Sequence, residues 1–136
     1  MLQKMQLALA LAAPVLWLFS MALPVVQQES VLFEWGPPDI GIVWAIYSVV
    51  GLLFSPEIFF IGTLPNILML IGSGAMFLDR HRASAICGGI AFLGAIFAGI
   101  GIAEDGTTLS VGYWVWIGSF LALLVAGVWG AARRFP

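Results

Sequence analysis

Four long runs of almost purely apolar residues divide this chain, and most of its charged residues lie in the segments that connect the runs or flank them. The runs cover residues 7–26, 56–78, 83–103 and 113–132, and each holds about 20 residues, enough for a helix to cross the ~30 Å core of a bilayer. Charged residues make up 9% of the 136 residues, where about 25% is usual for a soluble chain. We therefore expect an all-α, polytopic integral membrane protein with four transmembrane helices in one domain, residues 1–136.

The first run, 7–26, also has some features of a secretory signal peptide. Lys4 precedes it, and Ser20-Met21-Ala22 has the form of a cleavage site. The apolar run continues past Ala22 to Val26, which is not typical of a cleaved segment. We expect this run to be retained as a membrane anchor.

The apolar tract 40–78 is too long for a single crossing, because one helix over it would measure about 58 Å at ~1.5 Å per residue. Ser55-Pro56-Glu57 divides the tract. Serine favours the capping position, proline the first helical position and an acid the first turn. The sequence therefore predicts a transmembrane helix over 56–78 and a separate short helix over about 40–54.

The basic residues decide how the short helix is placed. With four spans, all of them fall on one side of the membrane: Lys4, Arg80, Arg82, Arg133 and Arg134. A fifth crossing over 40–54 would separate the first of these from the rest. The positive-inside rule thus predicts four spans with both termini in the cytoplasm. Segment 40–54 carries Trp44 and Tyr47, which favour headgroup depth, so we expect an external interfacial helix, or a shallow re-entrant one.

Small residues recur at every fourth position in the last two runs. Such ladders allow close approach of two helix backbones in a membrane. The helix-packing positions predicted from them are Ala91, Ala95, Gly99, Gly118, Ala122, Ala126 and Gly130. We expect the two runs to pack as an antiparallel hairpin, with self-association as the alternative. Leucine at Gly99 or Ala122 should then be badly tolerated, and Leu123→Ala should be mild.

The second run contains the candidate polar site, formed by Glu57, Thr63 and Asn66. Pro65 inside this run is expected to kink the helix, because it has no backbone N–H to donate to the carbonyl of Ile61. Asn66 then has two readings: an interhelical hydrogen bond that steadies the kink, or a ligand-contacting notch. Glu57 is expected to act in the first turn of the helix, with an external cation or proton site as its alternative.

The residue inventory excludes most catalytic chemistry. Cys87 is the one cysteine and His81 the one histidine, and we expect the histidine to be a loop residue between Arg80 and Arg82. No catalytic, cofactor-binding or metal site is expected, and the protein is not expected to be an enzyme. A net charge of −2 without a basic stripe also predicts no nucleic-acid partner.

Two segments carry a family resemblance. Segment 112–119 reads GYWVWIGS, and Trp35-Gly36 follows the first run. Both resemble small uncharacterised four-span bacterial inner-membrane proteins, in their closing span and their external loop respectively. Those proteins carry an Asn-Pro pair at the start of the second span, whereas Pro65-Asn66 here is reversed and lies deeper. The resemblance covers about the C-terminal quarter of the chain. It implies the four-span topology and the bacterial cytoplasmic membrane, but no activity.

The expected function is that of a non-catalytic accessory or scaffolding subunit of a larger membrane complex. Its expected partners are the lipid bilayer and other membrane subunits, or further copies of itself. The alternative is a small oligomeric transporter or channel with a polar path near Thr63, Asn66 and Glu57.

Overall fold

The computed structural model describes residues 2–26, 40–51, 59–104 and 108–133. Within these ranges the fold is all-α, as the sequence predicts, with two isolated β-bridges and no strand. The elements are α1 (Leu2–Ser20), α2 (Gly41–Gly51), the π-helix η1 (Phe59–Thr63), α4 (Leu64–Phe77), α5 (His81–Glu104) and α6 (Val111–Ala132).

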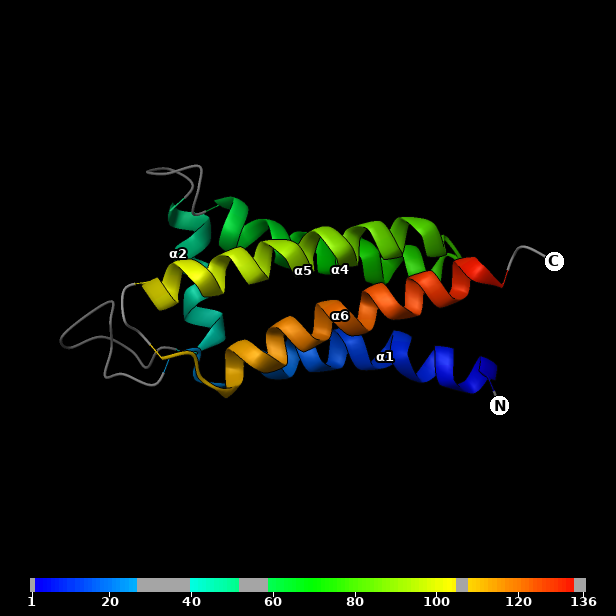
Figure 1. Cartoon of the computed structure of the whole chain (residues 1–136), viewed down its shortest axis with the longest axis horizontal. Coiled ribbons are helices and arrows are strands. Elements are labelled where there is room, and N and C mark those ends of the chain that lie inside the picture. Colours follow the sequence, from blue (N-terminus) through cyan, green and yellow to red (C-terminus); the bar gives the residue numbers. More distant parts are fainter. Residues whose placement is uncertain (1, 27–39, 52–58, 105–107, 134–136) are drawn as a thin grey trace.

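Helices α1, α4, α5 and α6 run along the long axis of the molecule, and both ends of the chain lie at the same end of it (Figure 1). The main packing partners are α5 with α6, α1 with α6, and α4 with α5. The long helices therefore pack in the order α1, α6, α5, α4. α1 and α4 are the outer members of this order and share few contacts with each other.

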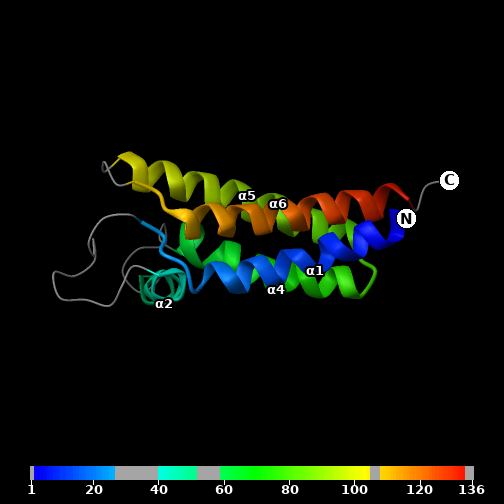
Figure 2. The same cartoon turned by 90° about the horizontal axis from the view of Figure 1, so that it is seen from below.

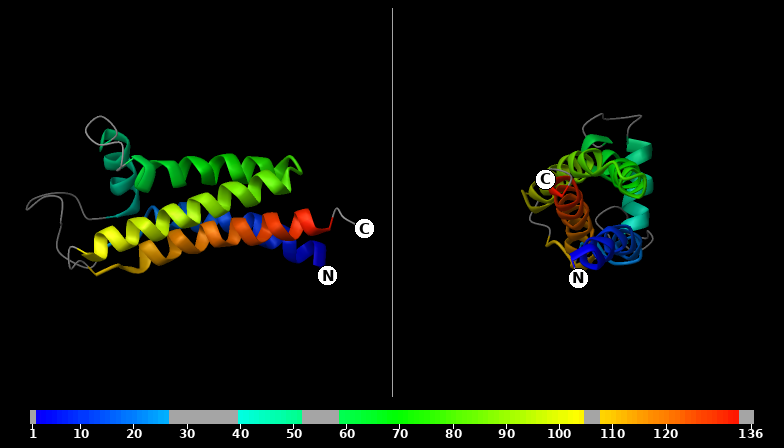
Figure 3. Two further views of the ribbon diagram at one scale, coloured as in Figure 1. Left: turned by 45° about the horizontal axis from the view of Figure 1, so that its top comes forward. Right: turned by 90° about the vertical axis from the view of Figure 1, so that its right-hand side faces the viewer.

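α2 lies crosswise to the other helices, at the end of the molecule opposite the termini (Figure 2). It starts against the end of α1, where the Ile42 N–H donates to the carbonyl of Met21 at 2.9 Å, and it also contacts η1. It therefore bridges the α1 side and the α4 side of the bundle, which the end-on view in Figure 3 shows.

Two of the described helices, α5 and α6, are long and apolar enough to cross a membrane. Leu7–Ser20 within α1 and Leu64–Phe77 of α4 are apolar but shorter.

The first helix ends at Ser20, so the predicted boundary at residue 26 is wrong. Pro24 has no N–H and cannot continue a helix, and the turn after Ser20 closes with Leu23 N–H donating to the Ser20 carbonyl at 3.2 Å. Residues 21–26 form turns and bends with isolated bridges at Pro24 and Val26, and the carbonyl of Val25 accepts from Ser110 N–H at 2.8 Å. This segment joins the starts of α2 and α6.

Pro65 lies in the first turn of α4, directly after η1, rather than inside one continuous helix as the sequence predicted. A proline in that turn removes a donor that a helix start does not need. A change from π to α geometry therefore falls at the position where the sequence predicted a kink. The predicted helix start at Ser55-Pro56-Glu57, the end of the 40–54 segment and Glu57 itself lie outside the described residues.

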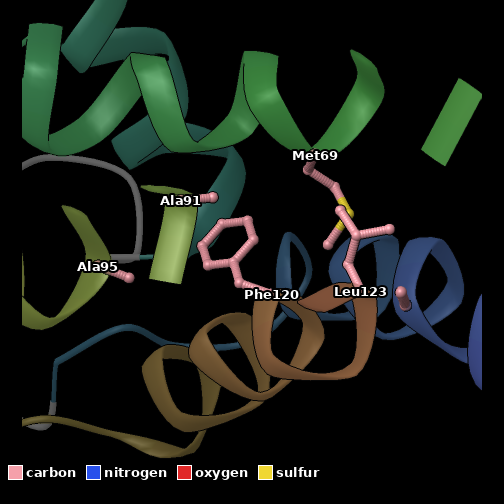
Figure 4. Close-up of a cluster of buried hydrophobic side chains, with 6 residues drawn as sticks. Met69, Ala91, Ala95, Phe120 and Leu123 are labelled. Carbon is pink, nitrogen blue, oxygen red and sulfur yellow. The ribbon is translucent and has the colours of Figure 1, made fainter. Parts of the chain in front are cut away.

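Every long helix contributes to the central core. Its buried residues are Ala13 of α1, Met69 of α4, Ala91 and Ala95 of α5, and Phe120 and Leu123 of α6. Phe120 and Leu123 point from α6 toward the α4 and α5 side, where Met69 and the two alanines lie (Figure 4). Leu123 is 0% exposed, and this burial favours a large cost for Leu123→Ala over the mild effect expected from the sequence.

The predicted ladders are only partly at the interface between helices. Ala91, Ala95, Gly99, Ala126 and Gly130 are buried. Ala122 is half-buried against the core, and Gly118 is half-buried with open space where a Cβ would stand.

Two other glycines lie where the backbones of α5 and α6 approach each other closely. A Cβ on Gly127 would lie 2.5 Å from the backbone nitrogen of Ala85, and one on Gly88 would lie 2.7 Å from that of Leu124. These two contacts bring the helices together with backbone against backbone.

Candidate functional site

The side-chain amide of Asn66 connects three helices. Its Oδ1 accepts hydrogen bonds from Trp17 Nε1 of α1 at 2.8 Å and from Trp116 Nε1 of α6 at 2.9 Å. Its Nδ2 donates to the carbonyl of Gly62 in η1 at 2.9 Å. We call Asn66, Trp17 and Trp116 the amide node. The interhelical hydrogen bond expected of Asn66 is present, and it is doubled.

Only one orientation of the Asn66 amide satisfies all these partners. An indole N–H can only donate and a backbone carbonyl can only accept. The oxygen must therefore face the two tryptophans and the nitrogen must face Gly62. A residue that lacks either the acceptor or the donor cannot replace asparagine here without leaving a polar group unpaired.

Both tryptophans of the node stand in the same short pattern, Trp-x-x-Ser, in two different helices. Ser20 Oγ donates to the Trp17 carbonyl at 2.6 Å, and Ser119 Oγ donates to the Trp116 carbonyl at 2.6 Å. The serines are 1% and 0% exposed. Each buried hydroxyl is thus satisfied within its own helix, and the indole N–H of each motif is directed to Asn66.

An aromatic row on α6 continues from the node. The rings of Trp116 and Phe120 meet edge to face, with centroids 4.9 Å apart. On the other side of Trp116, Tyr113 donates its hydroxyl proton to the Ala95 carbonyl at 2.8 Å. A Cβ on Gly99 would overlap the Tyr113 hydroxyl. Gly99 therefore leaves the space that this tyrosine occupies.

The structure describes two of the three residues of the predicted polar site. Asn66 is half-buried and Thr63 is 7% exposed in η1, in the segment just before it. Glu57 lies outside the described residues, so the structure does not bring it to the other two. The node's amide and its two indoles contain no nucleophile and no titratable group, and what they do chemically is hydrogen-bond one another.

Sequence reasoning missed Trp17 and Trp116 as partners of Asn66. A signal was present, because a buried indole N–H needs an acceptor, and an asparagine at depth supplies one. Which tryptophans are near enough depends on how the helices are packed.

Other polar groups lie away from the node. Among the described residues, the buried atoms Trp44 Nε1 and Ser84 Oγ have no hydrogen-bond partner. His81 is the first residue of α5 and not a loop residue, and its Nδ1 lies 3.2 Å from the Met76 sulfur. Its Nε2 lies 3.7 Å from a carboxylate oxygen of Asp79, whose φ of 59° forms the tight turn before α5.

Groups of three or more His, Cys, Asp or Glu residues that could hold a metal ion do not occur among the described residues. The geometry of the described part of the chain thus consists of packed helices joined by one amide node. No family model, curated protein or solved structure matches this chain, so functional inference starts from that geometry.

Proposed function

We propose that the chain is a four-span, non-catalytic protein of the bacterial cytoplasmic membrane, with both termini in the cytoplasm, and that it serves as an accessory or scaffolding subunit of a larger membrane complex. α1, α4, α5 and α6 are the spans, and α2 is the external interfacial helix.

The apolar outer faces of these helices support a membrane location. Large hydrophobic side chains are exposed along all of them, and examples are Val15 and Leu18 of α1, Leu70 and Ile71 of α4, Leu93 and Phe97 of α5, and Leu121 and Val128 of α6. Exposing such an apolar surface to water is unfavourable, whereas lipid tails or apolar partner helices would cover it.

The position of the basic residues supports the proposed topology. Lys4 near the start of α1, Arg80 and Arg82 at the α4–α5 turn, and Arg133 after α6 all belong to the end of the molecule where both termini lie (Figure 1). Placing this end in the cytoplasm satisfies the positive-inside rule. α2, at the other end, then lies along the external interface.

The observation that carries the subunit proposal is the bonding of Asn66. Its oxygen already accepts two indole N–H groups and its nitrogen already donates to a backbone carbonyl. The amide that lies deep in the second run is thus used for internal packing, which favours a structural role over a transport path. α1 and α4 share few contacts with each other, and both expose large hydrophobic side chains that partner helices would cover.

Purification in a mild detergent tests the proposal. The full chain carrying an affinity tag is extracted from the native membrane, and its molar mass and co-purifying proteins are measured. We expect a complex with a larger membrane protein in fixed stoichiometry. A homo-oligomer that conducts a solute across vesicles would instead support the alternative, a small transporter or channel.

The Asn66→Leu variant separates the two functions further. In a subunit, this change should lower stability and assembly together. Loss of transport or cellular phenotype at normal abundance and normal assembly would contradict the subunit proposal, because a site can fail while the fold persists.

A further inference from the structure

The C-terminal half of α6 carries an open groove of about 610 Å³ on the outer surface of the bundle. Its lining residues are Leu124, Val125, Val128, Trp129, Ala132 and Arg133. All but the last are apolar or aromatic, and Val128 is 53% exposed. The groove thus has an apolar length and one cationic end.

Arg133, the cation at this end, contacts another residue that lines the groove, Trp129. The guanidinium carbon of Arg133 lies 5.6 Å from the centre of the Trp129 ring, within the range of a cation–π contact. Arg133 is the residue that ends α6, at the end of the molecule where the chain termini lie. A tryptophan and an arginine at such a place match the depth of lipid headgroups.

Further positive charge belongs to the same end. Gly127 of α6 packs against Ala85 of α5, so the start of α5, with Arg82, lies beside this half of α6. Asp79, in the turn before α5, is the carboxylate nearest in sequence to Arg82, and its Oδ1 lies 3.7 Å from Nε2 of His81. The cationic side chains outnumber it.

From this arrangement we propose that the groove binds one anionic phospholipid, with an acyl chain along the α6 residues Val125–Ala132 and the phosphate on Arg133. A guanidinium pairs with phosphate oxygens through two parallel hydrogen bonds, while the apolar lining accepts a hydrocarbon chain. A zwitterionic lipid carries its own cation beside the phosphate, so a net negative headgroup fits this end of the groove better. The inference rests on the membrane location proposed above.

Photo-crosslinking of a defined lipid tests the site. The full chain is reconstituted in phosphatidylcholine vesicles that contain a little phosphatidylglycerol with a photoreactive acyl chain, and crosslinked peptides are mapped by mass spectrometry. We expect labelling concentrated on Val125–Ala132. Arg133→Gln should lower it about fivefold, the effect of one basic residue near an anionic lipid, and Arg133→Lys should restore most of it.

Two further variants serve as controls. Lys4→Gln removes a cation at the same end but on α1, and should change α6 labelling less than twofold, within the scatter of a single surface charge. Val128→Trp fills the groove at an exposed position that leaves the core intact, and should lower labelling while Arg133 remains.

Several results would overturn the inference: even labelling along all helices, equal labelling by a photoreactive phosphatidylcholine, or a Lys4→Gln effect as large as that of Arg133→Gln. Protein–protein crosslinks from the groove in place of lipid adducts would show that a second copy covers it. Flotation of the vesicles distinguishes a failure of the lipid site from a failure of the proposed membrane location. A chain that floats with the vesicles without labelling on α6 disproves the lipid site alone, and a chain that does not float disproves the membrane location too.

Discussion

Asn66 is the residue whose replacement should disturb most partners at once. In Asn66→Leu, the indole N–H groups of Trp17 and Trp116 lose their common acceptor. An unsatisfied buried donor costs about 1–3 kcal/mol, so we expect a loss of about 2–4 kcal/mol in the free energy of unfolding, more than the ~0.5–2 kcal/mol of a single interhelical hydrogen bond. Reversible unfolding in mixed micelles measures it.

The control for this prediction removes the donors as well. With Trp17→Phe and Trp116→Phe added, Asn66→Leu should cost clearly less than it does alone, because no indole N–H is then left unpaired. Equal costs in the two backgrounds would show that the amide node contributes no coupling energy.

Gly99 and Tyr113 form the second residue-scale pair. Gly99→Ala places a methyl group where the Tyr113 hydroxyl lies, so the ring must move and its hydrogen bond to the Ala95 carbonyl must break. We expect a loss of about 1–3 kcal/mol, the usual cost of overpacking. In a Tyr113→Leu background the same change should cost much less, and an unchanged cost by thermal unfolding would place the strain elsewhere.

At the scale of the helical element, two glycines of α6 make a matched pair. Gly127→Ala forces a Cβ to within 2.5 Å of the Ala85 backbone nitrogen, while Gly118→Ala meets nothing within 4 Å. Backbone atoms cannot step aside, so Gly127→Ala should separate α5 from α6 and destabilise by about 1–3 kcal/mol. Gly118→Ala should be neutral or stabilise by up to about 1 kcal/mol through helix propensity. Similar melting temperatures for the two variants would contradict this interface.

The inward face of α6 is tested by two leucines. Leu123 is 0% exposed and Leu121 is 44% exposed. Leu123→Ala should cost about 2–5 kcal/mol, because it leaves a cavity between α4 and α6, and Leu121→Ala should cost less than about 1 kcal/mol. The two losses in the free energy of unfolding, measured in detergent, show which side of α6 faces the core. A larger loss for Leu121→Ala would mean that α6 is rotated about its axis relative to the structure.

At the scale of the whole molecule, the shared end of the basic residues predicts membrane orientation. In a background where Cys87 is replaced by alanine, Thr108→Cys should react with a membrane-impermeant thiol reagent from outside the cell. Arg82→Cys should react only after permeabilisation, because the positive-inside rule keeps that turn in the cytoplasm. Thr108 and Arg82 are both exposed, so burial does not decide the result. The opposite pattern would invert the proposed topology.

The sequence alone was enough for the helical class and for the bounds of the last two long helices. α5 was expected over 83–103 and covers His81–Glu104, and α6 was expected over 113–132 and covers Val111–Ala132. These elements could be read because their apolar runs are long and end at polar connectors. Asn66 also stood out, since an amide inside an apolar run requires a partner.

Only the tertiary structure decided which faces of those helices pack and what Asn66 binds. A membrane helix is apolar on all sides, so hydropathy does not mark the face that turns inward, and the fourfold spacing of small residues indicated Gly118 where Gly127 makes the contact. The partners of Asn66 stand 49 and 50 positions away in sequence, on helices α1 and α6, which share few contacts with α4. The spacing of residues within one helix does not indicate which residues so distant in sequence will contact it. The geometry of the amide node is therefore set by how α1, α4 and α6 come together.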